Sequence, residues 1–279
     1  MRLALRFSYF GDGFFGSQMQ PGLRTVEGEF IAACRRLDLF EDWREAGFST
    51  AGRTDRGVHA RCQVCSFSTD EPDRAIRSLN RVLPEDIWCT AWAEVPEEFH
   101  PRYDALSRTY SYYFFPAPGD TARMHEAAEK FTGRHNFSAF ARAGDRNPER
   151  EVSGARVFED GHFIIFEVTG VSFLWNMVRG MATALERVGR GEIDPEEVAR
   201  LLAEPPGQRL PAAPPEGLVL WYIDYTIPFM PLPTDEKGRG HRGSRRYSYH
   251  TVMAEVSALL APEDVNCTTE PDSRPDIHI

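Results

Sequence analysis

The chain has 279 residues, of which 42% are hydrophobic and 12% aromatic, so it can bury a sizeable core and is not a disordered protein. Its formal net charge of −10 excludes a broadly basic surface, but RNA binding needs only a local basic patch and stays open. No apolar run approaches the roughly 20 residues that span a bilayer, and the first residues do not form a signal peptide, so we expect a soluble, cytoplasmic protein without a membrane partner.

The first hundred residues alternate between strand and helix patterns. Leu3, Leu5, Phe7 and Tyr9 alternate with other residues, which is typical of a strand. Thr25 is a predicted N-cap that precedes acidic residues in the first turn of a helix. Further on, the patterns predict a short strand near 48, a strand at 63–68, a helix from 72 and a strand at 87–95. The predicted order is β-α-β-β-α-β.

The second half repeats that order. The alternation at 109–115 predicts a strand, and the segment 124–131 predicts a helix closed by Gly133. The dipeptide Asp160-Gly161 predicts a hairpin turn between two strands. A helix through 177–188 that ends at Gly189, a short helix from 194 and a strand at 218–225 complete the pattern.

Both halves therefore fit a ferredoxin-like unit of the α/β (α+β) class. We expect antiparallel or mixed sheets that join, with a catalytic cleft between the two units. The predicted domains are an N-terminal unit at 1–105 and a C-terminal unit at 106–228, followed by an extension at 229–279.

The extension has a basic, glycine-rich stretch at 237–246 and an acidic, proline-bearing end. This composition favours a solvated, mobile segment. A contact with RNA phosphates is the alternative, because arginine and lysine neutralise phosphates without prior order.

Five cysteines are scattered along the chain, and this odd number argues against a complete disulfide framework. Cys62 and Cys65 form a C-x-x-C motif, a pattern that binds zinc in other proteins. No second pair stands at zinc-finger spacing, and the predicted strand points the two thiols to opposite faces. We interpret both as ordinary small residues and expect no metal.

The most informative segment is the loop A-G-R-T-D-R-G-V-H-A at 51–60, between two predicted strands. Asp55 is flanked by Arg53 and Arg56, and a nearby guanidinium favours the ionised carboxylate that a nucleophile or base requires. Two glycines permit a tight loop on a rigid sheet, which is a usual place for chemistry. A turn with a surface salt bridge is the alternative for a D-R-G tripeptide alone.

The whole string resembles the catalytic signature of the TruA-type tRNA pseudouridine synthases, and the resemblance extends over about residues 3 to 227. Further blocks that agree in order are Y-F-G-D-G-F-F-G-S-Q-M-Q-P at 9–21 with T-V-E-G at 25–28, Asn80 with L-P-E-D-I at 83–87, F-H-P-R at 99–102, R-T-Y-S-Y at 108–112, S-F-L-W-N-M-V-R at 172–179 and E-G-L at 216–218. The resemblance implies an isomerase that converts uridine to pseudouridine on the 3′ side of the tRNA anticodon stem-loop. It also implies that the enzyme needs no cofactor and works as a homodimer that tRNA spans.

Carried over residue by residue, the resemblance implies that Asp55 is the nucleophile, which attacks the target uridine at ribose C1′ or base C6. Tyr110 is implied to stack on the flipped base and to assist removal of the C5 proton. Arg179 is implied to pair with Asp55, with Arg53 as a second candidate partner. Without the family, the residues favour a core aromatic for Tyr110 and a solvent-facing helical arginine for Arg179.

Three further residues are expected at the site. Leu218 matches a leucine that lines the base pocket, although a buried strand leucine would look the same. Arg56 and His59 are expected to contact substrate, and His59 also to orient the loop. Two departures from the family, Ser17 in place of tryptophan and Thr183 near a frequent glycine, are expected to affect packing rather than activity.

Two other classes of function remain as alternatives. In a non-catalytic RNA-binding module Asp55 would be a turn residue, and the basic stretch 142–156 would be an RNA-facing loop or, equally, a solvated connection. In a hydrolase with an aspartate nucleophile or base, a metal would usually be held by several acids, and no such cluster accompanies Asp55 in the sequence.

Overall fold

A computed structural model describes residues 1–144, 147–204, 209–233 and 252. Met1–Pro233 form one compact unit. The basic stretch 237–246 and the acidic end of the chain lie outside the described residues, so the predictions for them stay predictions. Among the described residues, no helix combines the length and the apolar composition that a membrane crossing needs.

The first half has the predicted element order. The side chain of Thr25 caps the first helix by accepting a hydrogen bond from the Gly28 N–H at 3.3 Å, and Pro72 stands in the first turn of the second helix, where its missing N–H is harmless. The elements are β1 Arg2–Tyr9, α1 Val26–Arg36, β2 Ser49–Thr50, β3 His59–Ser68, α2 Pro72–Val82 and β4 Ile87–Glu94.

The second half repeats this order with additions. The predicted hairpin is confirmed, because β7 and β8 pair across a turn at Gly161, whose φ of +60° suits glycine. The helix predicted at 124–131 begins earlier, after Asp120, whose carboxylate caps the Arg123 N–H at 3.0 Å. The elements are β5 Ser107–Phe114, α3 Thr121–Glu129, β6 Gly133–Asn136, β7 Glu149–Asp160, β8 Phe163–Gly170, α4 Met177–Gly189, α5 Pro195–Ala203, the 3-10 turn η1 Pro215–Gly217, β9 Leu218–Asp224 and β10 Met230–Pro231.

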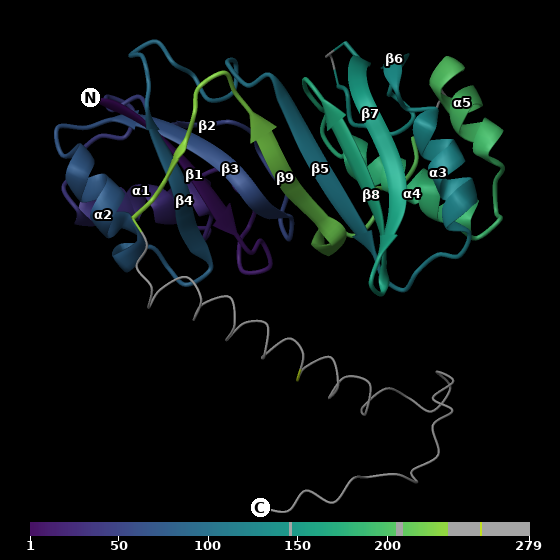
Figure 1. Ribbon diagram of the computed structural model, residues 1–279, viewed down its shortest axis with the longest axis horizontal. Helices are drawn as coiled ribbons and strands as arrows, with labels where there is room; N and C mark the ends of the chain where they lie inside the picture. Colours follow the sequence, from purple (N-terminus) through teal and green to yellow (C-terminus); the bar gives the residue numbers. More distant parts are fainter. Residues whose placement is uncertain (145–146, 205–208, 234–251, 253–279) are drawn as a thin grey trace, which may run out of the picture. The chain divides into compact units, whose positions relative to one another are not determined.

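The described strands form one ten-stranded sheet in the order β10-β4-β1-β3-β9-β5-β8-β7-β6, with β2 on β3 (Figure 1). Each half has the same internal order, β4-β1-β3-β2 in the first and β9-β5-β8-β7 in the second, as expected for ferredoxin-like units. The halves join where the beginning of β3 pairs in parallel with β9, through His59 with Val219 and Ala60 with Leu220. The predicted joining of the two sheets is confirmed.

This junction also positions the loop that contains Asp55. The far part of β3 pairs with β2 through Ser66 and Cys65, whereas its first residues pair with β9. The loop from β2 to β3 therefore emerges beside the start of β9, where the two halves meet. A residue of the first half is thereby brought next to elements of the second.

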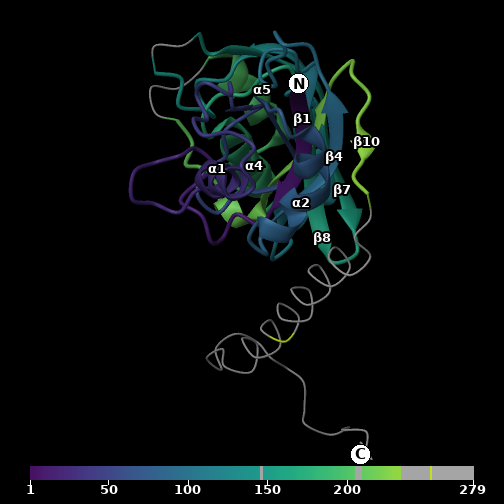
Figure 2. The ribbon, with the colours of Figure 1, turned by 90° about the vertical axis from the view of Figure 1, so that its left-hand side faces the viewer.

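Helices lie on one side of the sheet. Figure 2 shows α1 and α4 on one side of the body, with β4, β7, β8 and β10 on the other. Phe7 of β1 packs against Phe30 of α1 with ring centroids 4.9 Å apart. Buried side chains of both halves form a single hydrophobic cluster, so the two halves share one core. The division of the chain into units at 1–105 and 106–228 stays a proposal, and both units would contribute to this core.

Two short strands were not predicted. β6 begins at Gly133, so this glycine starts a strand in addition to following a helix. Residues 230–231, expected in the extension, pair with β4, and Leu232 is buried. The reason is tertiary: Phe229 stacks under the Arg6 guanidinium at 4.2 Å and beside Tyr225, which holds this segment to the sheet.

Candidate active site

Buried polar side chains of the first half hold the loop 51–58 through hydrogen bonds. The Tyr9 hydroxyl and Thr54 Oγ1 are 2.7 Å apart, and Ser17 Oγ accepts a hydrogen bond from the Thr54 N–H at 2.8 Å. The Gln63 amide donates to the Gly52 carbonyl at 2.9 Å. Gly52 and Thr54, on either side of Arg53, are therefore fixed. Thr54 in turn fixes the backbone that leads into Asp55. Burial raises the pKa of the Tyr9 hydroxyl, so this bond stays intact at neutral pH.

The opening turn of the chain packs tightly against the same loop. A Cβ on Gly11 would lie 2.0 Å from the Val58 carbonyl oxygen, so only glycine fits this approach. The Gly11 N–H donates to His59 Nδ1 at 3.0 Å. His59 thus links the end of the loop to the turn, and the roles expected for it at the site stay predictions.

Arg108 ties the loop to the second half from inside. Its side chain is buried and donates to the carbonyl oxygens of Ala51 at 3.1 Å, Arg102 at 2.6 Å and Val171 at 2.6 Å. Burial lowers the pKa of this guanidinium, and the three carbonyls offset the cost of removing it from water. One side chain therefore connects the segment before Asp55 with the segment that leads into α4.

Two donors from the second half hold the Asp55 carboxylate. Arg179 Nη1 of α4 donates to Oδ2 at 3.1 Å, and the Trp175 indole Nε1 donates to Oδ1 at 2.9 Å. Arg179 is itself fixed, because its Nε donates to the Ala213 carbonyl at 2.6 Å. The side chains of Asp55 and Arg179 are only 32% and 15% exposed, so solvent weakens their attraction less than at an open surface.

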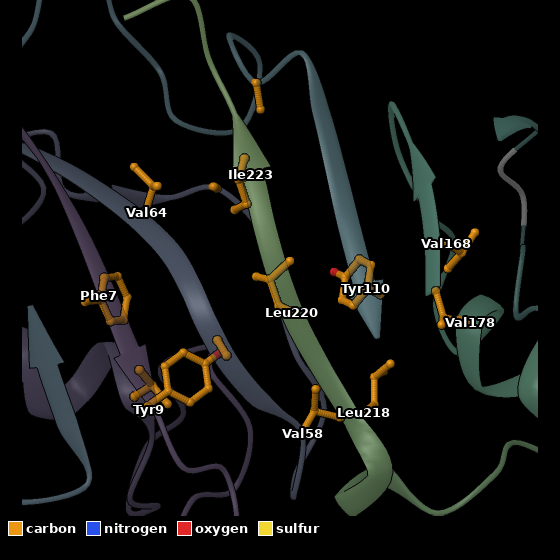
Figure 3. Packing of buried hydrophobic residues seen from close by; sticks show 14 of the residues in the cluster. Phe7, Tyr9, Val58, Val64, Tyr110, Val168, Val178, Leu218, Leu220 and Ile223 are labelled. Carbon is orange, nitrogen blue, oxygen red and sulfur yellow. The ribbon is translucent and has the colours of Figure 1, made fainter. Parts of the chain in front are cut away.

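Tyr110 and Leu218 lie near one another at the junction of the halves. Leu218 begins β9 and pairs with Tyr112, and Leu220 pairs with Tyr110 on β5. Figure 3 shows Tyr110, Leu218 and Leu220 together with Val58, the last residue of the Asp55 loop. Burial raises the pKa of Tyr110 to about 12, so its phenol is protonated at neutral pH. No described residue provides a hydrogen-bond partner for this hydroxyl, and the ring contacts Phe173 edge to face at 5.2 Å.

Arg53 and Arg56, the two arginines beside Asp55 in the sequence, make no ion pair with its carboxylate among the described residues. Arg53 is exposed, and no ion pair joins it to Asp55. Arg56 is exposed and lies over the Phe15 ring at 4.5 Å. The two arginines next to Asp55 in sequence therefore do not hold its carboxylate, whereas Arg179, 124 residues away, does.

Among the described residues, no group of three or more His, Cys, Asp or Glu side chains is arranged to hold a metal ion. Cys62 and Cys65 are both buried in β3, and burial raises the pKa of both thiols, which keeps them in the unreactive thiol form.

Comparison with known proteins decides the family. A family model described as tRNA pseudouridine synthase matches residues 127–226. The tRNA pseudouridine synthase A of Methanoculleus marisnigri is 70% identical over 263 residues, which cover 94% of this chain and 97% of that protein. The chain belongs to the tRNA pseudouridine synthase A family.

More distant members of the tRNA pseudouridine synthase A family agree over most of the chain. The protein of Methanosphaerula palustris is 51% identical over 246 residues, with 88% of each chain covered. That of Thermococcus kodakarensis is 46% identical over 240 residues, covering 85% of this chain and 89% of that protein. The family is one of isomerases, so the family and the class of enzyme predicted from the sequence motifs are confirmed.

Two site residues of this tRNA pseudouridine synthase A family member were missed or misjudged. In the sequence, Trp175 stands out only as part of the block at 172–179, and in the structure it precedes α4, before the left-handed Asn176. Ser17, expected to affect packing alone, contacts Thr54 and so supports the residue before Asp55. No local pattern signals either contact, because both partners are distant in sequence.

Proposed function

We propose that this chain isomerises uridine to pseudouridine on the 3′ side of the tRNA anticodon stem-loop, with Asp55 as the nucleophile. The observation that carries the proposal is the Asp55 carboxylate, held between Arg179 and Trp175 at the junction of two halves of a tRNA pseudouridine synthase A fold. A carboxylate beside an RNA site repels phosphates, so a protein that only bound RNA would gain nothing from holding one there.

The chemistry needs no exchange of atoms with another molecule. If Asp55 attacks ribose C1′, a carboxylate lone pair forms the new bond and the C1′–N1 electron pair leaves with the uracil, which turns and rejoins C1′ through C5. If it adds to C6, the electrons of the C5–C6 double bond move toward O4, the C1′–N1 bond then breaks, and the uracil turns so that C5 bonds to C1′. In both alternatives the bond to Asp55 breaks to release the carboxylate, C5 loses a proton and N1 gains one, so no redox partner or cofactor takes part.

Arg179 and Tyr110 have distinct parts in this proposal. Arg179 keeps the carboxylate ionised and aimed, since a fixed guanidinium favours the charged form. The Tyr110 ring stacks on the extruded base beside Leu218. With a pKa of about 12, the Tyr110 hydroxyl donates a hydrogen bond, and it can accept the C5 proton only after its own proton has passed to a stronger base.

Two exposed pairs of an arginine and an aromatic ring are candidate RNA contacts. One includes Arg56, the residue after Asp55, and the other includes Trp175, which bonds the Asp55 carboxylate. Arg56 lies over Phe15, and Arg142 lies over Trp175 at 4.8 Å. Such pairs offer a stacking face for bases and a cation for phosphates. Within the basic stretch 142–156, by contrast, Arg156 pairs with Glu167 at 2.7 Å, so Arg142 is the better candidate for an RNA contact.

We further propose a cytoplasmic homodimer. Phe115 and Phe163 are 78% and 41% exposed, and their rings lie 6.0 Å apart at one end of β5 and β8. Tyr113 adds an edge-to-face contact with Phe163 at 5.8 Å. Adjacent exposed rings of this kind are unusual on a monomer, and a second copy of the chain would cover them.

The experiment that tests the function uses an unmodified tRNA transcript with tritium at C5 of uridine, incubated with EDTA and no cofactor. Wild-type protein should release tritium and Asp55→Ala should not, while Asp73→Ala, which removes an exposed carboxylate on α2, should match the wild type. Release by Asp55→Ala at the wild-type rate would remove the aspartate from its role. A folded wild type that binds tRNA but releases nothing would indicate an RNA-binding module.

The position of the target is tested with transcripts in which the uridines on the 3′ side of the anticodon stem-loop are replaced by cytidines. Tritium release from the remaining uridines should then disappear. Undiminished release would place the target elsewhere in the tRNA and leave the isomerase activity intact.

A further inference from the structure

The two donors to the Asp55 carboxylate differ in charge and in anchoring. Arg179 is charged, 15% exposed on its side chain and bonded through its Nε to the Ala213 carbonyl, so it is a fixed part of the protein interior. Trp175 is neutral and 50% exposed, and its indole N–H is bonded to the other carboxylate oxygen. Oδ1 is therefore the oxygen held by the neutral and more exposed of the two donors.

The backbone around Trp175 is built to present the indole in this place. The Trp175 carbonyl accepts a hydrogen bond from the Arg142 N–H at 2.8 Å, in an isolated antiparallel bridge. Asn176, directly after it, has a left-handed φ of 64°, which a non-glycine residue adopts at a cost. The chain thus turns sharply into α4 immediately after Trp175, and the Arg142 guanidinium lies over the ring.

A charged donor draws more electron density from a carboxylate oxygen than a neutral donor does. Oδ2, bound to the guanidinium, is thereby the weaker nucleophile of the two oxygens. Oδ1 keeps more of the negative charge and is held in one direction by the N–H bond. An oxygen that is oriented without being neutralised suits attack on a carbon atom.

We propose that Asp55 attacks uridine through Oδ1 and that the indole N–H of Trp175 is a further catalytic group that aims this oxygen. The proposal rests on Asp55 being the nucleophile, as proposed above. Trp175 touches the reacting atom itself, whereas Ser17 and Arg108 act on Asp55 only through the backbone of its loop.

The test separates the N–H from the ring. Trp175→Phe keeps an aromatic face beneath Arg142 and removes the donor. A second variant carries the benzothiophene analogue of tryptophan at position 175, which keeps the size of the ring and has sulfur in place of N–H. Because Trp175 is half exposed, both variants should fold, and equal thermal midpoints would verify this.

The matched control is Trp43→Phe. Trp43 also carries an arginine over its ring, Arg44 at 4.5 Å, but it lies between α1 and β2 and is not one of the residues that hold Asp55. Its replacement should change neither kcat nor KM. The control therefore accounts for any general effect of losing an arginine-stacked indole.

With tritium release as the readout, both Trp175 variants should lower kcat by about 10- to 150-fold, the range for losing one hydrogen bond to a charged group. KM for tRNA should stay within about twofold, since the ring remains. An unchanged kcat in both variants, or a raised KM with kcat intact, would overturn the proposal by reducing Trp175 to an RNA-stacking residue. These outcomes need an active wild type and an inactive Asp55→Ala, so they are distinct from failure of the proposed function itself.

Discussion

At the scale of single residues, buried hydroxyl groups surround the Asp55 loop. Tyr9 bonds to Thr54 and Tyr112 donates to the Pro214 carbonyl at 3.1 Å, whereas Tyr110 has no hydrogen-bond partner among the described residues. Burial raises the pKa of both Tyr110 and Tyr112 to about 12. These phenols stay neutral at neutral pH, so their ionisation affects stability only in alkali.

Replacement of Tyr110 by phenylalanine tests this burial. A folded-state pKa above the unfolded value of 10.0 contributes stability that is complete below pH 10.0 and is lost as the pH rises to about 12. Over that window the wild type should lose about 1.4 kcal/mol of unfolding free energy per pH unit more than Tyr110→Phe. Urea unfolding at several pH values would measure the difference, and parallel curves would show that Tyr110 is accessible to water.

At the scale of elements, the turn after β1 and the loop before β3 form one unit. Gly11 approaches the Val58 carbonyl, Ser17 and Tyr9 hold Thr54, and Arg108 reaches in from β5. The two segments are over thirty residues apart in the chain, and their contact is what keeps Asp55 in place. Disturbing the turn should therefore disturb the active site.

Gly11→Ala tests the fit of these segments. The added Cβ would lie 2.0 Å from the Val58 carbonyl oxygen, so the turn or the loop must shift, at about 1–3 kcal/mol of unfolding free energy. Tritium release should fall as well, because Asp55 moves with the loop. Gly52→Ala is the control: a Cβ there meets nothing within 4 Å, so the change should be neutral or stabilising by about 0.4–1 kcal/mol. Equal urea midpoints for the two variants would contradict the tight approach.

At the scale of the whole molecule, the two halves act as one body because they share a sheet and a core. The parallel pairing of β3 with β9 closes the sheet between them, and Arg108 and the Asp55–Arg179 ion pair cross the same junction. The proposed catalytic groups are thereby contributed by both halves, and neither half carries the proposed site alone.

The proposed homodimer is tested at this scale. Light scattering after size-exclusion chromatography should give twice the chain mass of 31.6 kDa for the wild type. The double variant Phe115→Asp, Phe163→Asp should give a monomer, because charges on both rings prevent a second copy from covering them. Tyr103→Asp, at a residue that is 74% exposed, should remain dimeric. A monomeric wild type would remove the dimer from the proposal, and a dimeric double variant would move the interface elsewhere.

The sequence by itself determined most of the elements and pointed to 51–60 as the segment proposed to carry the chemistry. Alternation, the Thr25 cap, Pro72 and the Asp160-Gly161 turn depend on neighbours a few residues apart, so local patterns were sufficient. Only the tertiary structure decided which groups meet Asp55. Arg53, two residues away, makes no ion pair with it, while Trp175 and Arg179, 120 and 124 residues away, hold its two oxygens. The physical reason is that such contacts depend on how β3 packs against β9 and α4 reaches the junction, and no local periodicity records that packing.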